Sequence, residues 1–384
     1  MHKKECLIYY ILAKVNMNTN IYIDNMKRLG YYKEKINACL QGKNMNSEEI
    51  AKLANVSRST VSRVVNNYKN VPETTRKKVQ DVIDKYGYTP SSSARTLAGK
   101  SNDIIGLFIA DIDHTNNNMK WVGINSPYNS ELLSKVIQSC KKRGYMVLVN
   151  TITKEEECRQ LEQHFKNRML FGGIFVGFPY HMKALEEISE KKYNMVFIDQ
   201  WQKNDSIAKN VNNVNCDNVK GAKLVVEYLI EQGHRDIAFV KGDYRLSSFE
   251  RLQGYKEALT KNGIPINDEL ILTGEYRDDT AYNSVKKMLE KNRPTAIFSA
   301  NDIMALGVVK AIKEYNLDFP NDIAVVGFDN LQYMDWSSLK LTTVKVDMDQ
   351  LAEKAVDMLF SGEKGIYELL QPELVIRDSV PKIK

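Results

Sequence analysis

Eight apolar segments separated by helix-like stretches limit what most of this 384-residue chain can fold into. They lie at 104–112, 145–150, 172–178 and 194–199, and then at 236–242, 269–275, 295–302 and 322–330. Continuous apolar runs that alternate with amphipathic helices are typical of parallel sheets covered on both faces. Because the segments form two sets, we predict an α/β fold with two lobes. In such folds a ligand binds at the carboxyl ends of the strands.

The segment 46–87 has the period of helices instead. Its capping and turn residues are, in order, Asn46 or Ser47, Asn55, Ser57, Pro72 and Gly87. The first two can cap a helix whose apolar face is Ile50, Leu53 and Ala54. Asn55 tolerates the left-handed backbone of a tight turn, and a glycine commonly ends a helix. These signals predict an all-α head of three helices that contains a helix-turn-helix.

Charge is distributed unevenly along the chain. Residues 46–100 hold ten lysines and arginines against five acidic residues, and residues 1–45 hold eight against three. The whole chain carries +6, so the remainder is slightly acidic. A basic head on an acidic body is typical of a DNA-binding domain joined to another domain.

Several classes of protein are disfavoured by what the chain lacks. Its cysteines are widely spaced, without a Cys-x-x-Cys pair: Cys6, Cys39, Cys140, Cys158 and Cys216. This pattern argues against a zinc site or a disulfide framework and fits the cytoplasm. No apolar run is long enough to span a membrane, and the run at 6–15 lacks a signal-peptide cleavage site. Phosphate-loop and nucleophile-elbow motifs are also missing, so we expect no enzyme, no metal and no cofactor.

The second predicted helix carries polar side chains on its outward face: Arg58, Ser59, Ser62, Arg63 and Asn66. A helix of this kind fits the major groove of double-stranded DNA, where arginine can pair with guanine through two hydrogen bonds. Ser57 and Thr60 are better placed for phosphates, which set the register. Taken alone, a solvated face of a three-helix bundle explains the same residues equally well.

Three further features favour a DNA-reading helix over a solvated face. The segment 48–66 (EEIAKLANVSRSTVSRVVN), the Gly-Tyr-x-Pro sequence at 87–90 and the linker SSSARTLAGK at 91–100 closely resemble the lactose-repressor/galactose-repressor (LacI/GalR) family. The resemblance extends from Asn46 to Val380. It implies a transcription regulator in which the positions of Arg58, Ser59 and Arg63 read bases. Some members carry a larger amide residue at the position of Ser59, so their operator sequence cannot be transferred.

The same resemblance implies that the linker is a hinge helix that folds on operator DNA. Ala94, Arg95 and Leu97 fall in its register, and the leucine enters the minor groove and kinks the site. We therefore expect four parts: an extension at 1–44, a helix-turn-helix domain at 45–88, the hinge at 89–100, and a ligand-sensing and dimerisation domain at 101–384. Translation is expected to begin at Met45, with a basic DNA-binding arm at 1–44 as the alternative.

Polar residues lie where the apolar strands stop, and they are the candidate ligand contacts: Asp199, Trp201, Arg251, Asn301, Asp302 and Asp329. Each can instead be a helix cap or a turn residue, and for Asp302 that interpretation is equally good. The resemblance implies ligand contact at Asp199, Arg251, Asn301 and Asp329. It also makes Tyr128, in SPYNSEL at 126–132, a platform for a sugar ring, although Asn129 replaces the usual second aromatic residue. The extra stretch at 114–125 is assigned either to the cleft mouth or to the dimer surface.

Several carboxylates with one arginine fit a neutral mono- or disaccharide. An anionic sugar derivative, with Lys241 or Arg245 as the extra cation, is the alternative. We therefore predict a ligand-responsive regulator, most simply a repressor, that binds a palindromic operator as a homodimer.

Three rival functions compete with this prediction. A sugar-acting enzyme fused to a DNA module lacks catalytic motifs, and an exported sugar-binding protein does not explain the basic head. Control by a protein co-effector stays open; sugar binding to residues 101–384 distinguishes it from direct control.

Overall fold

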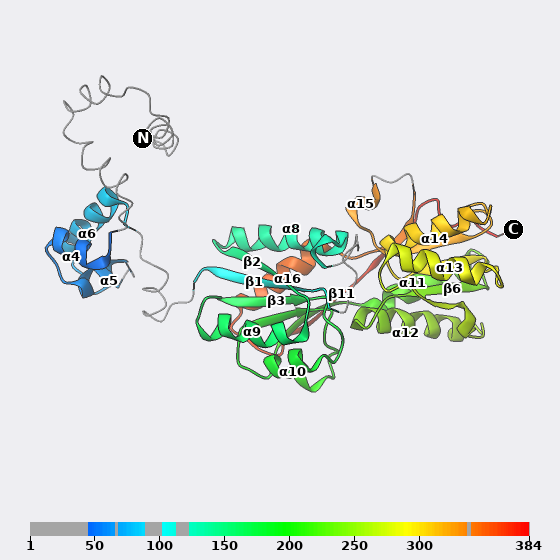
Figure 1. Ribbon diagram of the computed structural model, residues 1–384, viewed down its shortest axis with the longest axis horizontal. Coiled ribbons are helices and arrows are strands. Elements are labelled where there is room, and N and C mark those ends of the chain that lie inside the picture. Colours follow the sequence, from blue (N-terminus) through cyan, green and yellow to red (C-terminus); the bar gives the residue numbers. More distant parts are fainter. Residues whose placement is uncertain (1–44, 66–67, 89–101, 113–122, 336–338, 384) are drawn as a thin grey trace, which may run out of the picture. The chain divides into compact units, whose positions relative to one another are not determined.

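The computed structural model describes residues 45–65, 68–88, 102–112, 123–335 and 339–383 (Figure 1). The chain divides into two compact units, Met1–Gly99 and Lys100–Lys384. Several predictions lie outside the described residues: the extension at 1–44, the base contact of Asn66, and the hinge residues Ala94, Arg95 and Leu97. None of the helices in the described ranges is long and apolar enough to cross a membrane.

The first unit contains the three expected helices, α4 (Ser47–Ala54), α5 (Arg58–Val65) and α6 (Glu73–Tyr86). Asn46 caps α4 by accepting hydrogen bonds from the backbone of Glu48 and Glu49, and Glu49 bonds back to the Asn46 amide. The buried core is Ile50, Ala51, Ala54, Val61, Val64, Val71 and Val79. The prediction that Leu53 faces inward is wrong, because its side chain is 47% exposed.

The second unit begins with a lobe built on a six-stranded parallel sheet in the order β11-β5-β4-β3-β1-β2. The strands are β1 (Ile104–Ala110), β2 (Met146–Ile152), β3 (Gly172–Val176), β4 (Met195–Ile198), β5 (Asn212–Cys216) and β11 (Tyr367–Leu370). Helices α8 (Pro127–Lys142) and α16 (Met348–Phe360) cover one face of this sheet, and α9 (Glu155–Lys166) and α10 (Lys183–Ser189) cover the other (Figure 1). We call this the amino-terminal lobe.

The carboxyl-terminal lobe repeats the plan, with strand order β12-β10-β9-β8-β6-β7 and only β12 antiparallel. The strands are β6 (Ile237–Lys241), β7 (Ile271–Thr273), β8 (Ala296–Ser299), β9 (Ala324–Asp329), β10 (Thr342–Lys345) and β12 (Glu373–Val375). Its main helices are α11 (Asn218–Glu231), α12 (Leu246–Lys261), α13 (Asp278–Leu289) and α14 (Asp302–Glu314), and the short α15 is Gln332–Asp335. Single helical turns occur at Gly123–Asn125, Ser206–Lys209 and Asp268–Leu270.

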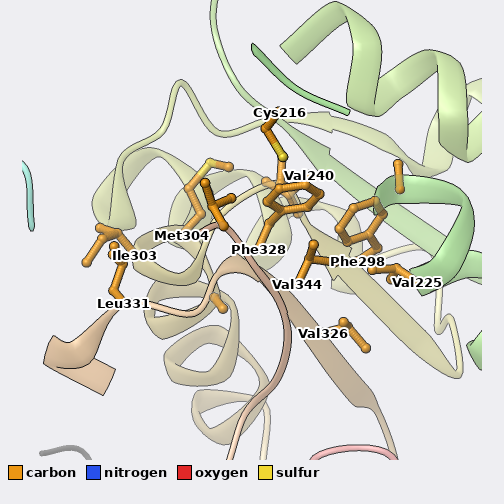
Figure 2. Close-up of a cluster of buried hydrophobic side chains, with 14 of the residues drawn as sticks. Cys216, Val225, Val240, Phe298, Ile303, Met304, Val326, Phe328, Leu331 and Val344 are labelled. Atoms are coloured by element: carbon orange, nitrogen blue, oxygen red, sulfur yellow. The ribbon is translucent and has the colours of Figure 1, made fainter. Parts of the chain in front are cut away.

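The core of the carboxyl-terminal lobe reaches to the crossing between the lobes. Figure 2 shows Phe328 of β9 among Val240, Val344 and Cys216, and Cys216 is the last residue of a strand in the other lobe. All four side chains are buried. The two-lobed α/β prediction is confirmed, and the apolar core is continuous through this crossing.

Close contact between α11 and α12 depends on Gly254. A Cβ atom at this position would lie 2.3 Å from the carbonyl oxygen of Val219 on α11. We expect Gly254→Ala to force the helices apart and to lower the free energy of unfolding by about 1–3 kcal/mol, the usual effect of overpacking. Urea denaturation measures the change, with Gln253→Ala on the exposed side of α12 as the control. Equal effects of the two substitutions would contradict the assigned packing.

Candidate functional site

The candidate DNA-reading surface is the outer face of α5. Arg58, Ser59, Ser62 and Arg63 are exposed there, as predicted, while Val61 and Val64 of the same helix are buried in the head. Alternation of this kind leaves one face of the helix available to a DNA groove. The role of each side chain in reading bases remains a prediction.

Residues near the start of α5 already have partners within the head, and these include Ser59, whose hydroxyl contacts Ser57 Oγ at 2.7 Å. Ser57 Oγ accepts a hydrogen bond from the backbone of Thr60 at 3.1 Å and contacts its hydroxyl at 2.9 Å. Arg58 Nε donates to Ser47 Oγ at 3.0 Å, and its Nη1 lies 3.6 Å from Glu48. Exposed ion pairs of this kind contribute little free energy. Arg58 can therefore exchange these partners for DNA at small cost.

The candidate ligand site is a cavity of about 180 Å3 between the two lobes of the second unit. Residues of both lobes line it, including five of the predicted ligand contacts: Tyr128, Asp199, Arg251, Asn301 and Asp329. They come from the ends of β4, β8 and β9, from the first turn of α8 and from the second turn of α12. The structure thus brings together four residues that were predicted at strand ends and Tyr128, which was predicted from the family resemblance; their contact with a ligand stays a prediction.

Arg251 is the most tightly held of these side chains, at 4% exposure. Its Nε donates to Asn218 Oδ1 at 2.9 Å, and its Nη1 donates to the carbonyl of Ala300 and lies 3.4 Å from Asp329 Oδ1. The guanidinium also lies over the Phe328 ring, with Cζ 3.7 Å from its centroid. These contacts fix the direction in which the remaining donors point.

Asp329 and Asp199 are held in strained positions at the cavity wall. Their φ angles are 107° and 50°, in the left-handed region that non-glycine residues rarely adopt. Burial raises the pKa of both carboxyls, and Arg251 partly offsets the effect for Asp329. Asp329 Oδ1 is buried and makes no hydrogen bond within the described protein. An oxygen in this state is suited to accept a hydrogen bond from a ligand hydroxyl.

The other lining residues combine structural contacts with access to the cavity. Asn301 caps α14 by accepting from the backbone of Met304 at 2.8 Å. Burial raises the pKa of Tyr128 well above 10, so its phenol remains a neutral donor. Asn129, in place of the expected aromatic residue, is buried and donates to the carbonyl of Gly123 at 2.7 Å.

Two predicted contacts do not face the cavity. Trp201 is fully buried in the core of the amino-terminal lobe, against Phe197. Asp302 is also fully buried, and it accepts hydrogen bonds from the backbone of Leu331 at 3.0 Å and from the Thr343 hydroxyl at 2.6 Å. The structure therefore places neither residue in the cavity lining: Trp201 packs in the core, and Asp302 joins α14 to the loop after β9.

Sequence reasoning missed other lining residues, among them Asp243, Ser247, Glu275 and Tyr276. Asp243, Glu275 and Tyr276 lie in the loops after β6 and β7, where a search of every strand end would have found them, and Ser247 lies in the first turn of α12. Of the two candidate cations, Arg245 lines the cavity and Lys241 does not. Ile112 and Gly123, which flank residues 113–122, also line it. Gly123, in the described end of the extra stretch, thus lies at the cavity, while residues 113–122 are outside the described ranges.

The burial of Asp302 predicts a pH effect on stability. Burial raises the pKa of its carboxyl to about 7, against the hydrogen bond from Thr343. The folded state thus holds a proton that the unfolded state loses near pH 4, so this contribution to stability declines as the pH rises through 7. The free energy of unfolding of Asp302→Asn, relative to that of the parent, should therefore increase by about 1–3 kcal/mol between pH 5 and pH 8. Urea denaturation at both pH values measures this, with the exposed Asp268→Asn as the control; a constant difference would contradict it.

Each of the two units contains a segment that matches a known protein family. Residues 48–91 match the family "Bacterial regulatory proteins, lacI family", and residues 226–380 match "Periplasmic binding protein-like domain". The HTH-type transcriptional regulator MalR of Clostridium butyricum is 35% identical over 87% of this chain and 99% of its own length. The HTH-type transcriptional repressor PurR of Histophilus somni (strain 2336) is 30% identical over 87% and 98%.

A solved structure resembles most of the chain. The lac repressor dimer, bound to operator and the anti-inducer ONPF, has a TM-score of 0.73 and 27% sequence identity, covering 88% of this chain and 100% of its own. Fold, head and sensor therefore agree with the resemblance seen in the sequence. The chain belongs to the lacI family of bacterial regulatory proteins, the DNA-binding transcription regulators that respond to a ligand.

Proposed function

We propose that this regulator is a repressor whose operator affinity is set by an uncharged, polyhydroxylated effector, such as a mono- or disaccharide, held in the cavity between the lobes. The observation that carries the proposal is the buried Asp329 Oδ1, which makes no hydrogen bond within the described protein and lies 3.4 Å from the oriented Arg251 guanidinium. Carboxylate oxygens accept hydrogen bonds from hydroxyl groups, and arginine donates to them. Tyr128 and Tyr276 add the apolar surface that the faces of a sugar ring require.

Both lobes would hold such an effector. Tyr128 and Asp199 belong to the amino-terminal lobe, while Arg251, Asn301 and Asp329 belong to the carboxyl-terminal lobe. A ligand that bridges them favours one angle between the lobes, and it shifts the equilibrium by its differential affinity for the two states. Typical coupling free energies are about 1–3 kcal/mol. We propose that this shift changes how the hinge at 89–100, with Ala94, Arg95 and Leu97, engages the operator.

Dimer formation is assigned to the edge of the amino-terminal lobe. The edge strand β2 exposes Met146 by 66% and Leu148 by 38%, and the neighbouring α8 exposes Ile137 by 42%. Exposed apolar edge strands are usually covered, and a symmetric second copy would cover this one. We further propose that the division into parts is 45–88, 89–100 and 101–384, that the protein acts in the cytoplasm, and that it catalyses no reaction.

The DNA-reading role of α5 can be tested with Arg63→Ala. After selection of an operator from random duplexes, we expect this variant to lose about 1–3 kcal/mol of operator affinity and to tolerate more sequences, as when a base contact is lost. Lys78→Ala removes an exposed charge from α6 and serves as the control. Fluorescence anisotropy measures both. If Arg63→Ala weakens operator and random DNA equally, Arg63 contacts phosphates and does not read bases.

The effector role of the cavity can be tested with Asp329→Asn and Arg251→Lys. Both avoid the larger loss of buried partners that replacement of Arg251 by alanine would cause. A thermal-shift screen of neutral sugars first identifies a ligand. Each variant should then bind that ligand about tenfold or more weakly, which corresponds to ~1.4 kcal/mol, and lose the ligand response of operator binding. Lys241→Ala, outside the cavity, should respond normally; unchanged ligand affinity in Asp329→Asn would refute the assignment.

A further inference from the structure

The loop between β6 and α12 places a second arginine at the cavity, and an acidic neighbour holds it. Arg245 Nε donates to Asp243 Oδ1 at 2.9 Å, and Arg245 Nη2 donates to Asp243 Oδ2 at 2.7 Å. The Arg245 backbone amide also donates to Oδ1, at 3.1 Å. A two-point pair of this kind is directional, and it neutralises the guanidinium where it stands. Both side chains line the cavity and are only partly exposed.

The ring of Tyr276 packs against the Arg245 side of this pair. The Arg245 guanidinium lies over the Tyr276 ring, with Cζ 4.4 Å from the ring centroid. The Tyr276 hydroxyl contacts Ser247 Oγ at 2.9 Å, and a Cβ atom on Gly242 would come within 2.3 Å of the ring. The ring therefore has little freedom to turn. Since the ring is fixed, the orientation of Arg245 is fixed as well.

One edge of the Arg245 guanidinium remains available. Nη1 makes no hydrogen bond to any residue in the described ranges. A Cβ atom on Gly177, at the end of β3 in the opposite lobe, would lie 3.8 Å from Nη1. Gly177 itself lines the cavity. The free donor edge thus points toward the space between the lobes.

Each arginine at the cavity is paired with a carboxylate. Asp243 pairs with Arg245, and Asp329 pairs with Arg251 at 3.4 Å. Asp199 and Glu275 add two further carboxyl groups to the lining, and Lys241 lies outside it. Neither guanidinium therefore offers uncompensated positive charge to a ligand. A phosphate or carboxylate entering the cavity would lose its hydration without gaining an unpaired cation.

We propose that the Asp243–Arg245 pair on Tyr276 determines the specificity of the effector cavity: Arg245 Nη1 donates to an oxygen of an uncharged ligand, and Asp243 keeps anionic ligands out by neutralising Arg245. This proposal rests on the proposed function, because it concerns the same cavity. It selects between the two ligand classes that the sequence left open. The arginine that could have served an anionic sugar derivative is the one that Asp243 neutralises.

The substitution Asp243→Asn tests the charge argument in the full-length protein. Asparagine has nearly the same shape and can still accept one hydrogen bond, but it leaves Arg245 with its charge unpaired. Inorganic phosphate is the probe, and titration calorimetry at low ionic strength measures it. We expect Asp243→Asn to bind phosphate about tenfold or more tightly than the parent, with the gain shrinking as salt is added.

Matched variants identify the source of that gain. Asp243→Asn combined with Arg245→Gln should lose the gain, whereas Asp243→Asn combined with Lys241→Gln should keep it, because Lys241 does not line the cavity. No gain in a folded Asp243→Asn variant, or a gain that survives Arg245→Gln, would overturn the proposal. If Asp243→Asn does not fold, Arg245→Gln alone must weaken the neutral sugar found by screening by about tenfold; unchanged affinity would also overturn it.

The phosphate measurements stand apart from the proposed function. A parent protein that binds no neutral sugar would refute the proposed effector class. The phosphate affinities of the parent and of Asp243→Asn would still show whether Asp243 neutralises Arg245. The two ideas can therefore fail separately.

Discussion

The burial of one guanidinium group constrains much of the carboxyl-terminal lobe. An unpaired charge costs too much to be kept away from water, so Arg251 must find partners wherever it is buried. It finds them on three elements: Asn218 on α11, the carbonyl of Ala300 after β8, and Phe328 and Asp329 on β9. The cavity floor therefore forms only when α11, α12, β8 and β9 are correctly packed.

The carboxyl groups near Arg251 outnumber the charge that it can neutralise. Burial raises the pKa of Asp199 to about 6 and that of Glu250 to about 7, and it raises the pKa of Asp329 as well. Burial favours the uncharged form of each carboxyl, and the Arg251 guanidinium opposes this for Asp329. Carboxyl oxygens accept hydrogen bonds from hydroxyl groups. The excess of carboxyl groups at the floor thus disfavours an anionic ligand independently of the Asp243–Arg245 pair.

The sequence predicted those strands and site residues that have a local sequence pattern, and it missed those whose burial depends on distant contacts. Continuous apolar runs identified most strands, but β5, β10 and β11 were missed. In β5 the reason is that Asn212, Asn213 and Asn215 are buried. Asn212 bonds to the carbonyls of Met358 and Glu363, and Asn215 bonds to that of Trp201. These contacts are long-range, and no local period reports them. The same limit explains Asp302, whose hydrogen bonds to Leu331 and Thr343 could not be foreseen from a strand end.

Asn218 shows how the cavity and the crossing between the lobes are one structure. It is fully buried, begins α11 and lies two residues after β5, where the chain leaves the amino-terminal lobe. Its Oδ1 accepts from Arg251, while its Nδ2 donates to Glu250 at 3.0 Å and to the carbonyl of Cys216 at 3.2 Å. One carboxamide thus joins the cavity arginine to the backbone of the crossing. A ligand that displaces the Arg251 side chain therefore also disturbs the hydrogen bonds of Asn218 at the crossing. A change in the backbone of the crossing likewise changes the orientation of Arg251.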